Sequence, residues 1–378
     1  MEKIIEIENV CKSYLNNVQV LKDISLTVRK NELVVLLGES GCGKTTMLKL
    51  LNCIESKDSG TIKIEGKDTS TLDPIALRRR IGCVVQQVGL FPHMTIKENI
   101  EIVNKICKLP KDQIEERTMR VMQMVGMDPD EYLGRYPNEL SGGQAQRIGV
   151  ARAYASDPEI VLMDEPFSAL DPITRKVLQR ELLDLQKKYP KTIVFVTHDI
   201  EEAILLADRI VLLNQGHIEQ IGTPRELLLT PKSDYVSRFL GEKRIWNSHW
   251  LIQCKDVMSE NISSIAETDT VASAWDLFEK DQTQAVLVLN DAGIAVGKLT
   301  EKILMRHVND TVVHDAMKEN FDYVYESTPL HDAVSLMNEK NILYLPVVDD
   351  QCHPKGMINM PDLMFIFDRN VLGALKEG

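Results

Sequence analysis

The sequence lacks several features that would identify whole classes of protein. Its seven cysteines are odd in number and include no Cys-x-x-Cys pair, so the sequence indicates neither a disulfide framework nor a zinc site and favours a reducing compartment. No apolar run approaches the ~18 residues of a membrane-spanning helix, and charges interrupt the apolar residues of the N-terminus. We therefore expect a chain that is neither exported nor membrane-spanning by itself.

Basic charge is also scarce. Lysine and arginine total 44 against 56 aspartate and glutamate residues, which gives a net charge of -12. Because nucleic-acid-binding domains normally present a basic face, no nucleic-acid partner is expected. A length of 378 residues is sufficient for two or three domains with their own cores.

A glycine-rich loop is the first positive signal. Residues 38–46 read GESGCGKTT directly after the apolar run 33–37, which is the strand-loop-helix setting of a phosphate-binding loop. Glycines let consecutive backbone N–H groups point at an anion, and the following helix adds its positive dipole end. We expect Lys44 to reach the β- and γ-phosphates and Thr45 to ligate Mg²⁺. The predicted nucleotide contacts in the loop are Gly38, Ser40, Gly41, Cys42, Gly43, Lys44, Thr45 and Thr46.

Two further apolar strands end in polar residues. Residues 160–163 precede Asp164 and Glu165, and residues 192–196 lead to His198. Residues 1 to about 230 alternate short apolar strands with amphipathic helices, which indicates an α/β domain. Because open α/β sheets bind ligands at the carboxyl ends of their strands, we expect these residues to converge with the phosphate loop. Asp164 would then face Mg²⁺ and Glu165 a water.

A second glycine pair opens a predicted helix at residues 140–147, LSGGQAQR. Small residues at a helix start free backbone N–H groups for an anion, although alone they would indicate only an ordinary N-cap. Since the loop at 38–45 already surrounds the phosphates, this helix start makes best sense if it closes over the nucleotide of another copy. The surrounding stretch, about 88–150, is predicted to be an inserted helical subdomain.

With these motifs, the first 230 residues resemble the nucleotide-binding subunit of an ATP-binding cassette (ABC) transporter. The resemblance implies a P-loop NTPase fold that hydrolyses ATP, and a head-to-tail homodimer with two ATP molecules between the subunits. For nucleotide and metal binding, the resemblance assigns Tyr14 to adenine, Lys44 and Thr45 to phosphate and Mg²⁺, and Asp164 to Mg²⁺.

For hydrolysis, the resemblance assigns Gln86 to Mg²⁺ and the attacking water, Glu165 to general-base or water-orienting catalysis, and His198 to the γ-phosphate. It assigns Ser141 and Gly143 to the γ-phosphate in trans, and Asp171 to the loop that joins the two sites.

The remainder of the chain contains an internal repeat with a period of 59 residues. Met258 recurs as Met317 and Gly297 as Gly356, among many identities at this offset. So many matches at one offset indicate duplication. Two copies can bury each other's apolar face, so a passive duplicated scaffold is one interpretation.

The repeat resembles two cystathionine-β-synthase (CBS) modules, which are α+β. Residues 86–100 and 164–175 resemble importer subunits for glycine betaine, carnitine, choline and other quaternary amines, a group that carries such a pair. The resemblance implies a peripheral protein at the cytoplasmic face of the cell membrane, with transmembrane permease subunits and an extracytoplasmic substrate-binding protein as partners. Two alternatives to this function are an importer ATPase for another cargo such as ergothioneine and a soluble ABC ATPase without a transport role. The implied domains are 1–240 for the ATPase, 241–253 for a linker, and 254–310 and 311–370 for the CBS repeats.

Each repeat retains half of a nucleotide motif. Nucleotide-binding CBS modules usually end in Gly-h-h-Thr-x-x-Asp, where h is apolar. The first copy keeps Thr300 but has Ile303 in place of the Asp, and the second keeps Asp362 but has Asn359 in place of the Thr. Cyclic di-AMP or another adenine nucleotide is therefore one candidate ligand, beside a scaffold or an ionic-strength sensor.

Overall fold

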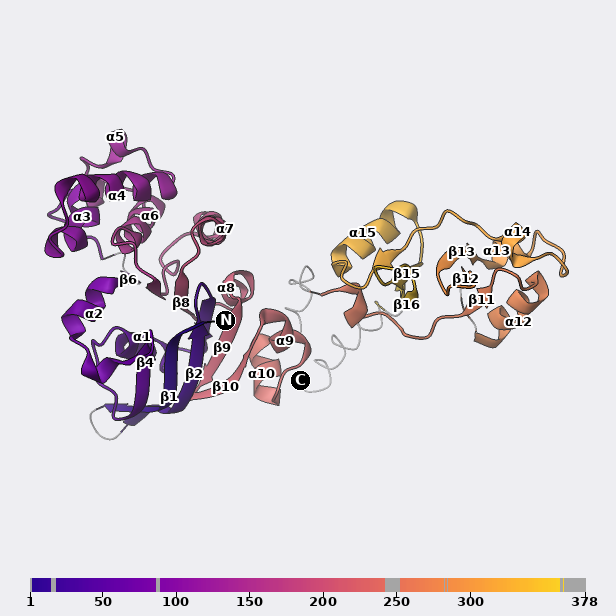
Figure 1. Ribbon diagram of the computed structural model, residues 1–378, viewed down its shortest axis with the longest axis horizontal. Coiled ribbons are helices and arrows are strands. Elements are labelled where there is room, and N and C mark those ends of the chain that lie inside the picture. Colours follow the sequence, from indigo (N-terminus) through magenta and orange to yellow (C-terminus); the bar gives the residue numbers. More distant parts are fainter. Residues whose placement is uncertain are drawn as a thin grey trace. The chain divides into compact units, whose positions relative to one another are not determined.

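The chain forms two compact units, Met1–Leu240 and Gly241–Gly378 (Figure 1). The computed structural model describes residues 2–14, 18–85, 89–241, 252–281, 283, 285–360 and 363. Among the described residues, no helix is long and apolar enough to cross a membrane.

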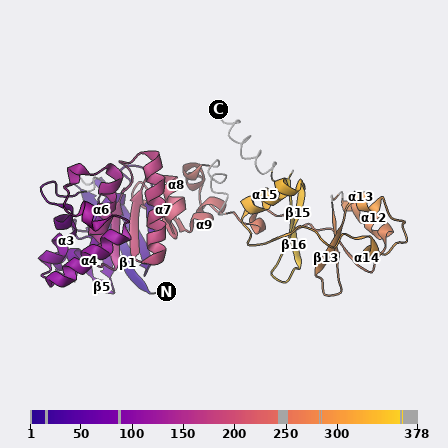
Figure 2. The same cartoon turned by 90° about the horizontal axis from the view of Figure 1, so that it is seen from above.

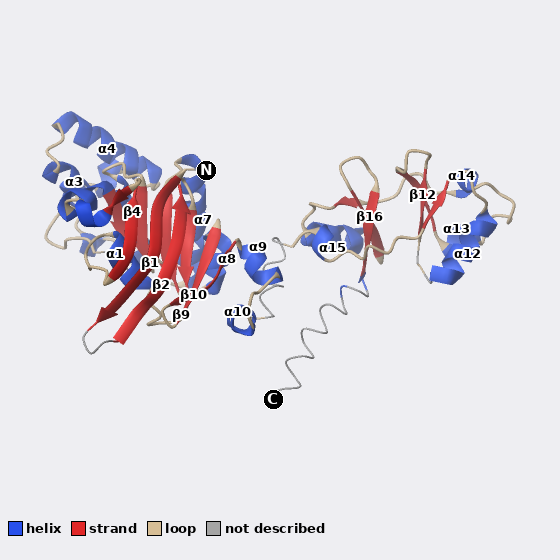
Figure 3. Cartoon of the chain, turned by 60° about the horizontal axis from the view of Figure 1, so that its bottom comes forward, coloured by secondary structure: helices blue, strands red, loops and turns tan. Residues whose placement is uncertain are grey.

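A four-stranded antiparallel sheet opens the first unit. Strands β1 (Lys3–Tyr14) and β2 (Val18–Arg29) pair along their length, and β4 (Ser59–Ile64) and β5 (Lys67–Asp68) complete the order β2-β1-β4-β5 (Figure 3). In β2 the buried residues alternate with more exposed ones from Ile24 to Val28, as a sheet with one covered face requires. The apolar pattern of the sequence indicates an α/β domain but does not indicate this separate antiparallel layer.

The second sheet carries the candidate site. Its six strands have the order β10-β9-β3-β8-β7-β6 and run parallel except for β10. All residues of the neighbouring strands β3 and β8 are buried, which explains why they are continuous apolar runs. The strands are β3 (Leu33–Leu37), β6 (Ile81–Val84), β7 (Ile160–Asp164), β8 (Thr192–Thr197), β9 (Arg209–Asn214) and β10 (His217–Gly222).

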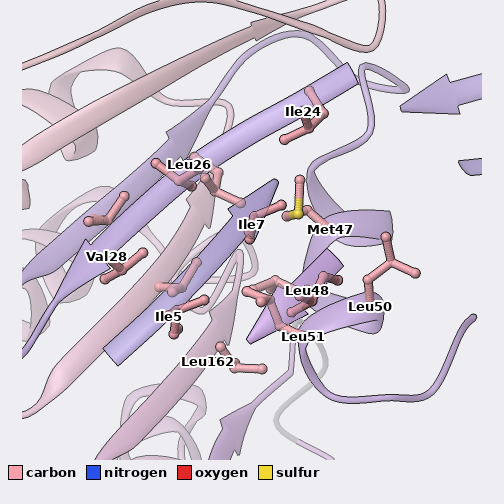
Figure 4. Close-up of a cluster of buried hydrophobic side chains, with 14 of the residues drawn as sticks. Ile5, Ile7, Ile24, Leu26, Val28, Met47, Leu48, Leu50, Leu51 and Leu162 are labelled. Atoms are coloured by element: carbon pink, nitrogen blue, oxygen red, sulfur yellow. The ribbon is translucent and has the colours of Figure 1, made fainter. Parts of the chain in front are cut away.

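The main core lies between the two sheets and includes the helix after the phosphate loop. Helix α1 (Lys44–Leu51) buries Met47, Leu48, Leu50 and Leu51 in a cluster with side chains of both sheets. Figure 4 shows these residues beside the β1 and β2 side chains and Leu162 of β7. The packing fixes the start of α1 against the strand ends.

The described part of the chain between β6 and β7 is mainly helical. Its helices are α3 (Ile96–Ile106), α4 (Lys111–Met124), α5 (Pro129–Tyr132) and α6 (Gly142–Tyr154), and they lie together in Figure 1. The other helices of the unit are α2 (Pro74–Arg80), α7 (Pro172–Lys188), α8 (Ile200–Leu206), α9 (Pro224–Leu229) and α10 (Asp234–Leu240).

The second unit contains two small sheets with the same internal pairing. In each, the first strand is parallel and the third antiparallel to the middle strand, and one helix packs on the middle strand. Figure 2 shows helices beside both sheets. The first repeat has β11 (Ser264–Ala266), α12 (Val271–Asp281), β12 (Val286–Leu289), β13 (Ala295–Leu299) and α13 (Glu301–Leu304). The second has α14 (Val313–Ala316), β14 (Val324–Tyr325), α15 (Leu330–Lys340), β15 (Tyr344–Val348) and β16 (Pro354–Asn359).

The two repeats exchange their opening segments. Ile252, just before the first repeat, and Cys254, at its start, are buried in the core of the second, whereas Val313 and Ala316 of α14 belong to the core of the first. A Cβ atom at Gly297 would lie 2.4 Å from Sδ of Met317, and one at Gly356 would lie 2.6 Å from Sδ of Met258. Each repeat therefore depends on the other for part of its core.

Candidate nucleotide site

Three strand ends meet at one edge of the parallel sheet. Leu37 of β3 pairs with Thr197 of β8, and Asp164 of β7 pairs with Val196 of β8. This register places the phosphate loop, the Asp164–Glu165 pair and His198 next to one another, so the expected convergence is confirmed.

The loop conformation requires glycine at two positions. Gly43 has a φ of 109° and lies so close to β2 that a Cβ atom would be 2.9 Å from the Val20 carbonyl oxygen. A Cβ atom at Gly38 would lie 2.3 Å from the Leu213 carbonyl oxygen. Both contacts are shorter than carbon and oxygen allow, and the backbone can follow this path only without side chains.

The Lys44 side chain folds back over the loop. Its Nζ donates hydrogen bonds to the carbonyl oxygens of Gly38 at 2.7 Å and Glu39 at 2.8 Å. The Cys42 sulfur lies 3.9 Å from the same nitrogen, and burial raises the pKa of the Cys42 thiol. The buried Lys44 ammonium group is thus held by the backbone of the loop in which we expect the phosphates to bind.

The Thr45 hydroxyl and Asp164 bring two oxygen donors together. Thr45 Oγ1 donates to Asp164 Oδ1 at 3.2 Å. Burial raises the pKa of the Asp164 carboxyl, which the Thr45 hydrogen bond partly offsets. Within the described ranges, no group of three or more His, Cys, Asp or Glu side chains could hold a metal. Two oxygens suit Mg²⁺, which protein sites commonly hold by one or two side chains together with phosphate oxygens and waters.

Glu165 and His198 form a pair beside this oxygen cluster. Glu165 Oε1 lies 3.1 Å from Nδ1 of His198, and the His198 side chain is 55% exposed. Glu165 has a left-handed φ of 42°, and its N–H donates to the Val196 carbonyl oxygen at 3.0 Å. The turn therefore places the carboxylate and the imidazole side by side at the carboxyl ends of β7 and β8.

The glycine pair at 142–143 opens α6 as predicted. Ser141 is its N-cap: the hydroxyl accepts from the Gln144 N–H, while the Ser141 N–H donates to Gln144 Oε1 at 2.9 Å. A Cβ atom at Gly143 would lie 2.7 Å from Cγ2 of Thr174. Asp171 caps α7 by accepting from the N–H groups of Ile173 and Thr174. Ser141 and Asp171 are exposed and so can meet a second molecule.

Other predicted site residues are placed less fully. Tyr14, at the end of β1, is 38% exposed, with the Lys12 ammonium 5.3 Å from its ring centroid. Thr300 caps α13 without a side-chain hydrogen bond to that helix. Gln86 and Asp362 lie outside the described residues.

Comparison with known proteins finds a matching family model in each of the two units. The ABC transporter family model matches residues 21–168, and the CBS domain model matches residues 254–310 and 313–369. The glycine betaine/carnitine/choline transport ATP-binding protein OpuCA of Bacillus subtilis is 41% identical over 98% of this chain and 97% of its own length. The choline transport ATP-binding protein OpuBA of the same organism is 40% identical over 99% of this chain and 98% of its own length.

This chain belongs to the ABC transporter family. It is an ATP-binding subunit with a tandem CBS pair, of the group that includes OpuCA and OpuBA, and it is an ATPase. ATP-binding subunits of such importers dimerise and work with membrane permeases. A solved post-hydrolysis dimer of the ATP-binding cassette MJ0796, bound to ADP and Pi, is similar to the first unit: it is 34% identical, covers 58% of this chain and 99% of its own, and has a TM-score of 0.52.

The structure of this ABC ATPase adds residues that the motifs did not indicate. Glu202 of α8 is 4% exposed and accepts hydrogen bonds from the Thr197 hydroxyl at 2.7 Å and the Gln179 amide at 3.1 Å. The Asp199 N–H in turn donates to Thr197 Oγ1 at 2.9 Å. This network holds the backbone on both sides of His198. No sequence motif indicated Glu202, because its burial becomes evident only from the packing of α8.

Proposed function

We propose that this chain energises the import of a quaternary ammonium solute of the glycine betaine, carnitine or choline type through a separate permease. The observation that carries the proposal is the similarity to OpuCA and OpuBA, which extends over both units and not only over the ATPase unit. Such a match favours transport over a soluble ABC ATPase without a transport role. A cargo such as ergothioneine remains the alternative within transport.

The site residues then take the following roles. Lys44 binds the β- and γ-phosphates, and the oxygens of Thr45 and Asp164 hold Mg²⁺ with Gln86. Mg²⁺ would neutralise charge on the phosphates when bound. Glu165 orients the attacking water, and its contact with His198 keeps both side chains at the γ-phosphate. The remaining loop residues, Gly38, Ser40, Gly41, Cys42, Gly43 and Thr46, surround the phosphates, and Tyr14 stacks on adenine.

Ser141 and Gly143 act on the nucleotide of a second copy. This role is supported by the exposed, capped start of α6, because a helix start offers backbone N–H groups to an anion. In this dimer Asp171 lies in the loop between the two sites. The assembly sits peripherally at the cytoplasmic face of the membrane, with an extracytoplasmic binding protein that delivers the solute to the permease.

Transport in proteoliposomes tests the cargo directly. The chain, its permease and the binding protein are reconstituted with internal ATP, and uptake of labelled choline, carnitine, glycine betaine and ergothioneine is measured. We expect ATP-dependent uptake of at least one of the first three compounds, and none with Lys44→Ala. ATP hydrolysis with uptake of ergothioneine alone would replace the proposed cargo, and hydrolysis without uptake of any solute would contradict transport of this class.

We also propose that the CBS pair binds cyclic di-AMP or another adenine nucleotide through Thr300 and Asp362. The half motif at each position supports the idea, and Trp275 of α12 provides a fluorescence signal within this unit. In a Lys44→Ala background, the nucleotide should change tryptophan emission, and Asp362→Ala should abolish the change. Absence of a response at millimolar nucleotide would favour a scaffold or an ionic-strength sensor.

A further inference from the structure

The first unit contains a cavity of about 280 Å³ between α6 and α7, here called the α6–α7 cavity. Its walls also include the end of α4 and residues on either side of the Asp164–Glu165 pair. Within the described residues, none of its lining belongs to the phosphate loop. Most of the wall is apolar, including Met124, Val125, Val150, Phe167, Leu178 and Leu182.

One buried polar group in this wall has no partner. Gln146 is 2% exposed and lines the cavity, and its amide nitrogen Nε2 makes no hydrogen bond within the described part of the chain. A buried donor without an acceptor is costly. An acceptor atom placed in the cavity would satisfy it.

The charges at the cavity wall balance each other. Arg147 of α6 and Glu181 of α7 form an ion pair of 2.5 Å, and Asp184 and Lys188 also belong to the lining. Two acidic and two basic side chains give no net charge to attract an ion. The wall therefore favours an uncharged molecule with an apolar body, because moving an ion out of water without an opposite charge is expensive.

We propose that the α6–α7 cavity binds a small uncharged molecule with an apolar body and one hydrogen-bond acceptor, and that its occupancy changes the rate of ATP hydrolysis. The acceptor meets Gln146 Nε2, and the body fills the apolar wall. The cavity touches Met163, which directly precedes Asp164, and α6, which begins next to Ser141. A molecule held there fixes the spacing of α6 from α7 and from the end of β7, and so connects a remote ligand to both halves of the nucleotide site.

Acetophenone is a suitable probe because it combines an aromatic ring with a carbonyl acceptor. A cavity of roughly 150 Å³ suffices for benzene, so this molecule fits. Ethylbenzene, which has no acceptor, is the matched control. In the full chain labelled with ¹³C-methyl methionine, Met124 and Met163 report on the cavity, Met47 on the fold of the ATPase unit, and Met337 on the other unit.

The expected result has three parts. Acetophenone shifts the Met124 and Met163 signals saturably and leaves Met337 unchanged. Gln146→Leu weakens acetophenone by roughly three- to tenfold, as expected for one lost hydrogen bond, but does not weaken ethylbenzene. Saturating acetophenone changes ATPase activity of the wild type at least about twofold and has no effect on Val150→Phe, in which the new ring fills the cavity.

The contrary results are equally definite. No saturable shift at Met124 and Met163 at millimolar acetophenone, or equal acetophenone affinity in wild type and Gln146→Leu, would overturn the site. Shifts at Met337 as large as those at Met163 would show nonspecific binding and overturn it as well. A filled site with unchanged ATPase activity would overturn the regulatory role. A changed Met47 signal in Val150→Phe would mean that this substitution disturbs the fold of the ATPase unit. The comparison with Gln146→Leu then decides: if the activity change requires the site, it should need roughly three- to tenfold more acetophenone in Gln146→Leu than in the wild type.

Discussion

The two units of this chain differ in where their functional residues lie. In the ATPase unit, the candidate site is assembled from loops that directly follow adjacent strands, so Thr45, Asp164 and His198 meet through the register of β3, β7 and β8. In the CBS unit, each repeat completes its core with the opening segment of the other. Local motifs therefore describe the first site well, whereas the second unit depends on contacts between distant parts of the sequence.

Glu165→Gln should produce the largest effect, because the ATPase unit depends on single side chains. The amide cannot accept the water's proton, so turnover should fall by on the order of 10² to 10⁴ while ATP still binds. Steady-state hydrolysis, equilibrium ATP binding and light scattering for a trapped dimer check this. Glu201→Gln, an exposed change near His198, is the matched control, and near-normal hydrolysis by Glu165→Gln would remove Glu165 from its role.

Alkylation of Cys42 should stop hydrolysis, but slowly. An adduct inside the loop would collide with the nucleotide, yet the thiol is 6% exposed and burial raises its pKa, so little reactive thiolate forms at neutral pH. Exposed Cys107 should react first without loss of activity. Mass spectrometry over a maleimide time course, with and without Mg-ATP, measures this order. Protection by Mg-ATP and resistance of Cys42→Ala are expected, and an equally sensitive alanine variant would implicate another thiol.

Gly356→Ala should test the exchange in the CBS unit. The new methyl would lie 2.6 Å from Met258 Sδ and 2.8 Å from the Ser259 carbonyl oxygen, and overpacking of this kind typically costs ~1–3 kcal/mol. At Gly297 the three atoms nearest to a new methyl all belong to the flexible Met317 side chain, so Gly297→Ala should cost less. Calorimetric unfolding of both variants measures the difference. Equal, negligible losses would mean that the exchanged segments are not tightly packed.

Glu202 should give the smallest effect, a dependence of stability on pH. Burial raises the pKa of Glu202 from its ordinary 4.5, so the folded protein binds this proton more tightly than the unfolded one. The stability that Glu202 contributes is then fully present below pH 4.5 and is lost as the pH rises through the raised pKa. The unfolding temperature of the ATPase unit, measured against Glu202→Gln, should decline across that range. A difference that stays constant with pH would contradict the raised pKa.

Part of the fold and of the candidate nucleotide site could be predicted from the sequence, for a geometric reason. Lys44 and Asp164 lie in or next to short loops whose conformation follows from glycines and strand ends, so their neighbours along the chain indicate their role. Part of the long strand β2 alternates in burial, but the sequence did not show that β1 and β2 form a separate antiparallel layer. Glu202 was missed because its partners, Thr197 and Gln179, meet it only through tertiary packing.

The CBS repeat also has contacts that the sequence alone does not reveal. The 59-residue period correctly indicated a duplication, and both copies have the same strand pairing. The period is equally compatible with two self-contained copies and with exchanged ones. Only the burial of Cys254 in the second core and of Val313 in the first distinguishes them.

We propose that each ATP site is completed by the start of α6 in a second copy of the chain. A mixture of two inactive variants, Lys44→Ala and Ser141→Arg, tests this shared site by complementation. In a head-to-tail dimer, a mixed pair regains one site with an intact loop and an intact helix start, so an equimolar mixture should recover up to roughly a quarter of the sites. Hydrolysis clearly above that of either variant alone is the predicted result. A mixture that forms dimers but hydrolyses no faster than its components would contradict the shared site.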